Sequence, residues 1–176
     1  MARLVQDRTC PGCDLRGVDL TGDSLMNVDL TGAKLQGAKM AGISMLGAQF
    51  TSADLTGADL SGATIGGVDF SDAVMPQVNL RNAVGTMARM ARVDLRGADL
   101  REARMNNVVL EAADLSAADL RGADLYSANL FFADLSDADL RGADLSNADF
   151  GEAILTGART DTETTCPDMT PGPCWD

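Results

Sequence analysis

A strict period of five residues runs through most of this 176-residue chain. From Leu15 to Leu155, every residue whose number is a multiple of five is a large aliphatic side chain or Phe, except Gly85. A period of five fits neither an α-helix, which repeats every 3.6 residues, nor a flat strand, which repeats every two. The chain must therefore turn a similar corner every five residues over this whole span.

The other positions of each five-residue unit are restricted too. Two residues before each large apolar position stands a small apolar residue, usually Ala or Val, with Asp23 as the clear exception. The residue between them is usually Asp, and the last two positions favour Ser, Thr or Arg followed by Gly. Two apolar positions around one polar position are typical of a short extended segment whose alternate side chains face inward. Gly and polar residues suit the corner that follows.

Composition narrows the possible core and the possible partners. Aromatic residues make up only 4% of the chain and histidine is absent, so small side chains must do most of the packing. The net charge of -12 disfavours direct nucleic-acid binding and attraction to anionic lipid. The same negative charge favours a basic protein as a partner. The sequence contains no run of about 18 apolar residues, so we expect no membrane insertion.

The repeated units resemble those of the pentapeptide-repeat family. The resemblance lies in units such as Ala98-Asp99-Leu100-Arg101-Glu102 and in the Ala-Asp-Leu-Arg-Gly and Ala-Asp-Leu-Ser-Asn units between 118 and 147. It implies an all-β fold, a right-handed quadrilateral β-helix with four pentapeptides per coil. A coil would then repeat every twenty residues, which gives about seven coils and a rod about 34 Å long. We expect an N-terminal cap segment (1–12), the solenoid (13–159) and a C-terminal cap or tail (160–176).

Stacking the sequence by twenty residues places like side chains in columns. One outward column is Asp59, Asn79, Asp99, Asp119 and Asp139, and a second, two residues further on, is Arg81, Arg101, Arg121 and Arg141. A column of like charges repels itself, so we interpret the arginines as charge balancing. The alternative is a functional acidic and basic stripe. The inward column of Leu30, Phe50, Phe70, Met90, Leu110, Leu130 and Phe150 is interpreted as core.

The pattern breaks once, between residues 83 and 92. Gly85 removes a core side chain, Val84 replaces a polar outward residue, and Met87 stands at a corner that normally takes Gly. Arg89 and Arg92 belong to a mid-rod band that holds six of the 14 basic residues. We interpret this stretch either as a docking site or as a decayed repeat that its neighbours compensate.

Aromatic side chains mark a second irregular place. Phe131 and Phe132 occupy both non-core positions of one unit, and Tyr126 occupies an outward position in the unit before. We interpret the Phe pair as local capping of a corner, with an interaction or dimer contact as the alternative. The candidate interaction residues are Val84, Met87, Arg89, Arg92, Tyr126, Phe131 and Phe132.

Four cysteines flank the repeats. Because the resemblance implies a rod about 34 Å long, a disulfide that joins its two ends is excluded by the Cα distance of less than about 7 Å that the bond requires. We expect Cys10 to pair with Cys13 and Cys166 with Cys174, closing the two ends. Free core thiols are one alternative, and metal or redox chemistry is another. The sequences around the cysteines resemble those of exported family members, so we expect a periplasm or lumen, with the cytoplasm as the alternative.

The carboxylates of the repeat do not form a recognisable catalytic set. No Ser/His or Cys/His pair and no phosphate-binding glycine loop accompanies them, so we expect neither an enzyme nor a cofactor or metal. The first hypothesis is a non-enzymatic structural or protein-interaction module with an unidentified partner, either a monomer or a homodimer. The resemblance implies one alternative, a DNA-mimic inhibitor or protector of DNA gyrase of the fluoroquinolone-resistance type. Those members dimerise through a C-terminal helical module, whereas residues 161–176 here predict no helix.

Overall fold

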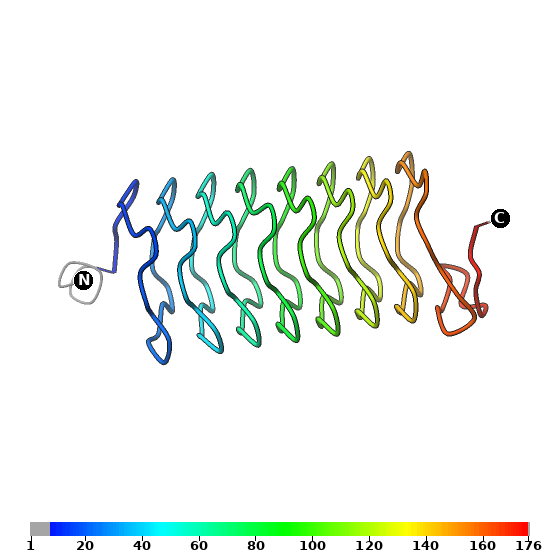
Figure 1. Cartoon of the computed structure of the whole chain (residues 1–176), viewed down its shortest axis with the longest axis horizontal. Helices are drawn as coiled ribbons and strands as arrows, with labels where there is room; N and C mark the ends of the chain where they lie inside the picture. Colours follow the sequence, from blue (N-terminus) through cyan, green and yellow to red (C-terminus); the bar gives the residue numbers. More distant parts are fainter. Residues whose placement is uncertain (1–7, 176) are drawn as a thin grey trace.

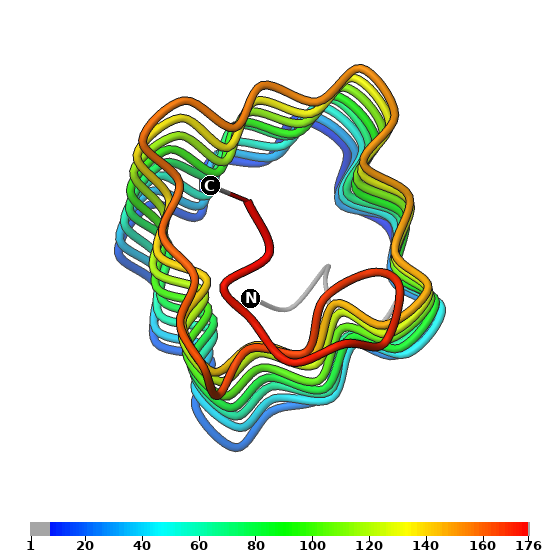
Figure 2. The ribbon, with the colours of Figure 1, turned by 90° about the vertical axis from the view of Figure 1, so that its right-hand side faces the viewer.

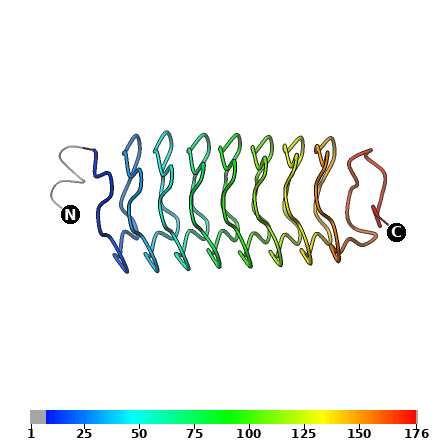
Figure 3. The ribbon, with the colours of Figure 1, turned by 90° about the horizontal axis from the view of Figure 1, so that it is seen from above.

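The computed structural model describes residues 8–175 as a straight rod of stacked coils with its two ends far apart (Figure 1). The view along the axis shows four sides that superimpose from coil to coil (Figure 2), and the view from above shows even spacing between coils (Figure 3). The described residues contain no helix and no continuous strand. Instead, each side carries one bridge residue at its centre, as Asp54 bridges in parallel to Lys34 and to Val74.

Parallel bridges join each central residue to the residue twenty positions later, from the pair Thr9 and Asp29 to the pair Asp139 and Arg159. A coil is therefore four pentapeptides, and the predicted right-handed quadrilateral β-helix is confirmed. We name the sides by the extended segments of the first coil and their equivalents every twenty residues. Face A contains residues 13–15, face B 18–20, face C 23–25 and face D 28–30. Residues 1–7 of the expected N-terminal cap lie outside the described residues.

The corners are four-residue turns. At a representative corner, the Ala33 N–H donates to the Leu30 carbonyl oxygen at 2.9 Å. The third residue of the turn has a positive φ at every corner from Gly12 to Gly157. Gly often occupies this position, yet Met87 (φ 57°) and Phe132 (φ 60°) adopt the same conformation. This left-handed backbone costs an L-residue roughly 1–2 kcal/mol, so the fold imposes it on these two side chains against their preference.

The interior is filled by the two inward positions of each unit. Leu, Met and Ile side chains of the middle coils are fully buried, together with the small Ala and Val side chains. Phe50 and Phe70 stack in adjacent coils with ring centroids 5.1 Å apart, which confirms the inward aromatic column as core. At the C-terminal mouth, Phe150 is only partly buried and packs edge-on against Trp175 at 5.3 Å.

Both ends carry a disulfide. Cys10 pairs with Cys13, with 5.4 Å between the Cα atoms, and Cys166 pairs with Cys174 at 5.3 Å, so the structure contains both predicted pairs. The ladder shifts by one residue near the C-terminus, where Asp144 bridges to Thr165. The chain then doubles back, and Thr165 pairs antiparallel with Pro171 as the last segment crosses the mouth of the rod (Figure 2). Residues 8–175 include no helix with the length and apolarity required to cross a membrane.

Candidate functional site

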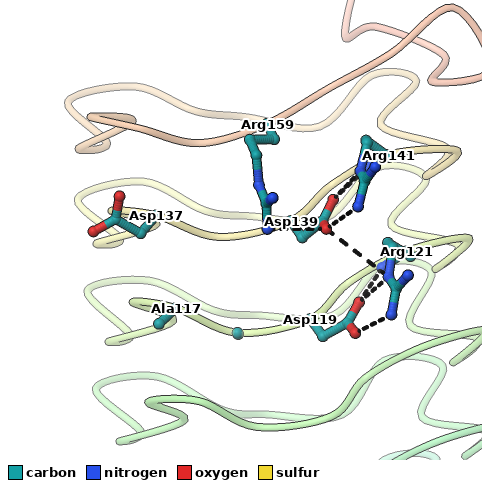
Figure 4. A pocket seen from close by; sticks show the side chains of 8 residues that line it. Ala117, Asp119, Arg121, Asp137, Asp139, Arg141 and Arg159 are labelled. Carbon is teal, nitrogen blue, oxygen red and sulfur yellow. Dashed lines mark hydrogen bonds and ion pairs between the residues drawn. The ribbon is translucent and has the colours of Figure 1, made fainter.

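An ordered lattice of Asp and Arg side chains runs along face B and its corner with face C (Figure 4). Arg121 donates from Nε and Nη2 to the two carboxylate oxygens of Asp119, at 2.8 and 2.7 Å. The same guanidinium lies 3.9 Å from Asp139 in the next coil. Arg101 and Arg121 therefore each lie between two carboxylates of adjacent coils that would otherwise repel each other. The hydrogen bonds from Arg121 lower the pKa of Asp119.

Asp139 is the centre of the lattice. Its carboxylate lies 2.7 Å from Arg141, 3.1 Å from Arg159 and 3.9 Å from Arg121, and its side chain is only 8% exposed. The hydrogen bonds from Arg141 lower its pKa, helped by the charge of Arg159. These side chains line a hollow of about 380 Å³ (Figure 4). This geometry agrees with charge balancing, because every oxygen of the central carboxylate faces a guanidinium.

The mid-rod arginines do not form a one-sided positive patch. Arg89 lies 3.6 Å from Asp69 on face D, and Arg92 donates to Asp72 at 2.6 and 2.8 Å on the corner between faces D and A. Other members of the band lie on two further corners, between faces A and B and between B and C, and on face C: Arg81, Arg96, Arg101 and Arg104. The band therefore encircles the rod, and much of its charge is paired with aspartate of the same or the neighbouring coil.

The core is intact at Gly85. A Cβ built on Gly85 would overlap the Met105 sulfur and lie 3.2 Å from Ile65 Cγ1, so the side chains from the coils on either side fill the gap. Gly85 is itself buried. The neighbouring Val84 is half-buried on face C, whereas Met87 is 64% exposed at the next corner. The interior of the break is thus compensated, and only its outer surface is available to a partner.

The candidate interaction residues gather on one side of the rod. Six of them lie on face D or its two corners, and Val84 lies on the adjacent face C: Met87, Arg89, Arg92, Tyr126, Phe131 and Phe132 are the six. Among these, Arg89 and Arg92 engage aspartates of the preceding coil. Along the chain these residues form two separate stretches, and the twenty-residue stacking brings them to one side.

Phe131 and Phe132 are held in a fixed arrangement. Their ring centroids lie 4.3 Å apart at an interplanar angle of 65°. The Phe131 ring lies over Gly151 of the next coil, where a Cβ would overlap it, and the Phe131 N–H donates to Asn129 Oδ1 at 3.0 Å. Phe132 is 56% exposed and Tyr126, at the opposite corner of face D in the same coil, is 44% exposed. We call Tyr126, Phe131 and Phe132 the aromatic surface.

Two polar features escaped the sequence analysis. Arg159 completes the Asp139 cluster, and Asp161 and Thr164 accept the Gly142 N–H at 3.0 and 3.1 Å in place of a carbonyl of a further coil. A signal for both exists in the columns. Arg159 stands at the next position of the Asp column, and Asp161 stands at the next position of the Arg column. The signs of the two charges are therefore reversed in the last coil.

Stacked five-residue units with a continuous parallel ladder define a four-sided β-solenoid. The model of the Pentapeptide repeats family matches eight copies within this chain, at residues 24–67, 65–101, 94–130 and 133–159. The chain belongs to the pentapeptide repeat family.

Solved structures of this family resemble the chain to different degrees. A trypsin-treated variant of QnrB1, described as a plasmid-mediated fluoroquinolone resistance protein, is 22% identical with a TM-score of 0.70, over 87% of this chain and 89% of that chain. This likeness shows the fold alone. HetL from Nostoc sp. Strain PCC 7120 is 26% identical over 97% of both chains with a TM-score of 0.32. A thylakoid-lumen member from Arabidopsis thaliana is 35% identical over 68% of this chain and 66% of that chain, with a TM-score of 0.29. No curated protein matches the chain.

Proposed function

We propose that the chain is a non-enzymatic protein-interaction module that docks a partner protein through the aromatic surface. The observation that carries this proposal is the placement of the aromatic residues. The chain has seven, five Phe, one Tyr and one Trp. Three are core or mouth residues and one belongs to the C-terminal cap: Phe50, Phe70, Phe150 and Trp175. The remaining three all lie in one coil, on the two corners of a single face.

Exposed aromatic side chains are the residue types on which protein interfaces most depend. Tyr, Trp and Arg dominate binding energy at interfaces, and aromatic residues and Met are enriched there. The aromatic surface supplies Tyr126 and the Phe pair, and Met87 and Arg89 lie on the same side of the rod two coils earlier. A rigid solenoid presents such side chains without the entropy loss that a flexible loop would suffer on binding.

The backbone at Phe132 adds a second argument. The corner requires a positive φ, and Gly or a small polar residue meets this requirement more cheaply than Phe. An exposed Phe at this position therefore lowers stability without filling the core. A contribution to binding is the physical advantage that such a side chain offers.

The carboxylates support a non-enzymatic role. The most enclosed of the lattice aspartates, Asp139, is paired with three arginines, and these interactions lower its pKa. It therefore stays ionised at neutral pH and is a poor proton donor. Neighbouring Asp119 is held in the same way by Arg121. The arginines that line the hollow around them are paired with these two aspartates.

Site-specific photocrosslinking tests the docking surface. A benzophenone amino acid replaces Phe132 in one variant and Gln77 in a control, since Gln77 is also an exposed corner residue with positive φ but lies between faces A and B. In extract from the native host, we expect a discrete adduct at position 132 that excess unlabelled protein competes away. Excess protein carrying Phe132→Gly should not compete. Identical adducts from both positions would contradict the proposal.

A second candidate function is imitation of duplex DNA at DNA gyrase. It is favoured by the net charge of -12 and by a column of outward carboxylates on face A, formed by Asp94, Asp114 and Asp134. One arginine lies on this column, Arg96, which pairs with Asp94 at 2.7 Å and lies 3.7 Å from Asp114. On face B, in contrast, arginines of successive coils pair with the equivalent aspartates. A supercoiling assay with purified gyrase tests this function. Inhibition of supercoiling, or protection from the drug, at micromolar protein would support DNA mimicry if Asp114→Asn and Asp134→Asn weaken the effect. Unchanged supercoiling would exclude it.

A further inference from the structure

The last coil has an unpaired backbone edge on face A. In the coil before it, the Phe132, Leu135 and Asp137 N–H groups donate to the carbonyl oxygens of residues 151, 154 and 156 at 2.8–2.9 Å. The Ala133 carbonyl accepts from the Ile154 N–H at 2.9 Å. The equivalent groups one coil later are the N–H groups of residues 152, 155 and 157 and the carbonyl of residue 153. None of these four groups has a backbone partner among residues 8–175.

The C-terminal cap closes a different side. The Leu145 and Asn147 N–H groups donate to the carbonyls of Thr165 and Pro167 at 2.8 and 2.9 Å, so the cap completes face C. The Gly172 N–H then donates to the Thr164 carbonyl at 2.7 Å, which pairs the outermost strand of the cap. In Figure 2, this segment crosses the mouth and leaves much of the last coil uncovered. We call residues 152–157 the open edge.

The side chains of the open edge are apolar where earlier coils are charged. Asp94, Asp114 and Asp134 occupy the central outward position of face A in the three preceding coils, whereas Ile154 occupies it here and is 50% exposed. The inward residues Ala153 and Leu155 are only partly buried, although their equivalents in the coil before are fully buried. Exposed strand edges are normally blunted by charge, because they recruit further strands. Here the charge is absent at the centre of the edge.

We propose that the open edge binds an extended apolar segment of a partner protein by strand addition. The preceding coils show what fills such an edge: a chain that supplies three carbonyl oxygens and one N–H over six residues. A bound segment would place its fourth residue over Ile154, as Ile154 itself lies over Asp134. Its third and fifth residues would cover Ala153 and Leu155. Main-chain hydrogen bonds then give affinity, and the three consecutive side chains give specificity.

A single strand fits this end better than a second rod. The disulfide-closed cap extends past the last coil at the mouth, as Figure 1 shows, so a flat coil of a second copy does not stack over the whole end. A strand needs only the six residues of face A and its corners. This inference rests on the proposed function as an interaction module, but it uses a surface separate from the aromatic side chains.

The test uses a labelled peptide with the core sequence Gly-Thr-Val-Ile-Val-Thr between terminal lysines, measured by fluorescence anisotropy and by amide hydrogen exchange. We expect saturable binding and slower exchange of the Leu155 and Gly157 amides, by about tenfold or more at saturation. A matched peptide with Pro in place of the Ile lacks the required N–H and should bind at least about tenfold more weakly.

Protein variants complete the experiment. Ile154→Asp restores the charge of earlier coils and should weaken peptide binding by about tenfold. The control Val74→Asp makes the same change in the same column, at a side chain 40% exposed but in a coil paired on both edges, and should leave binding unchanged. Phe132→Gly should also leave it unchanged, which separates this inference from the aromatic docking surface.

Two outcomes would overturn the inference. In the first, the exchange of the Leu155 and Gly157 amides does not slow even at about 1 mM peptide. In the second, sedimentation shows that the protein alone dimerises and that Ile154→Asp abolishes the dimer, which would assign the edge to a second copy. If crosslinking at position 132 fails while the peptide still binds, the proposed docking through the aromatic surface is contradicted and the proposal for the open edge stands.

Discussion

Met105 occupies the space that a side chain at Gly85 would need. The Met105 sulfur reaches across from the next coil, and Ile65 approaches from the coil before. At the break in the repeat, the Met105 side chain of the neighbouring coil therefore fills the space that the missing side chain of Gly85 leaves in the core. A long, unbranched and flexible side chain is suited to fill such a gap.

This relationship predicts strong coupling between the two positions. Gly85→Leu alone should overpack the core and destabilise the protein by about 1–3 kcal/mol. Met105→Ala alone should leave a cavity and cost about 2–5 kcal/mol. Because the new Leu fills that cavity, the double variant should be more stable than the sum of the two effects predicts, by at least about 1 kcal/mol. Urea denaturation of the native protein, the two single variants and the double variant measures this coupling. Strictly additive effects on the free energy of unfolding would show that Met105 does not fill the space at Gly85.

Phe132→Gly should raise the stability of the rod by about 0.5–1 kcal/mol. The corner requires φ near 60°, which Gly adopts without steric cost, and the Phe side chain is mostly exposed. Ala112→Gly is the matched control, because Ala112 occupies the same corner one coil earlier with φ 54°. Both should shift the urea midpoint upward, while Gly142→Ala should shift it downward. A loss of stability in Phe132→Gly would mean that the Phe pair holds the corner together, as the capping interpretation requires.

Much of this architecture is predictable from the sequence, and the reasons are physical. A five-residue period without insertion fixes which side chains face inward, and a long rod leaves only the two local cysteine pairings. The side shared by Met87 and Phe132 was not predicted, because the two residues are 45 positions apart and stand at opposite corners of face D, so neither lies in the column of the other. The cap escaped prediction because the Asp144 to Thr165 pairing is one residue out of step with the repeat.

Asp139→Asn should destabilise the protein by about 2 kcal/mol at pH 7, since it removes the counter-charge of a guanidinium cluster around a side chain that is only 8% exposed. Pairing lowers the pKa of Asp139 in the folded state. Its stabilisation is therefore present above the unfolded-state pKa of about 3.9 and is lost as the pH falls through the lower folded-state pKa.

Denaturation curves at pH 7 and at lower pH test this dependence. The difference between the native protein and Asp139→Asn should shrink steadily as the pH falls below about 4. Asp14→Asn is a suitable control, because the Asp14 and Arg16 side chains are 53% and 61% exposed and their pair should not move the urea midpoint measurably. A pH-independent difference for Asp139→Asn would show that its role is packing rather than charge.

Removal of the Cys166–Cys174 disulfide should loosen the C-terminal end without unfolding the middle of the rod. The bond closes a loop with a sequence separation of eight residues, and the chain-entropy model assigns such a loop about 2.5 kcal/mol. In a protein with both cysteines replaced by Ser, amide exchange should accelerate in residues 143–170 and stay unchanged in residues 50–110, because each coil contacts mainly its neighbours. Replacement of Cys10 and Cys13 is the matched control and should affect only the first coils. Uniform acceleration along the rod would contradict local closure.

The most direct test of the docking surface compares the affinity of the crosslinked partner for Phe132→Gly and Ala112→Gly proteins, both expected to be at least as stable as the native chain. If the aromatic surface binds the partner, Phe132→Gly should weaken binding by about tenfold or more while Ala112→Gly leaves it unchanged. Equal affinity of the two variants for the partner would contradict the proposed role of Phe132.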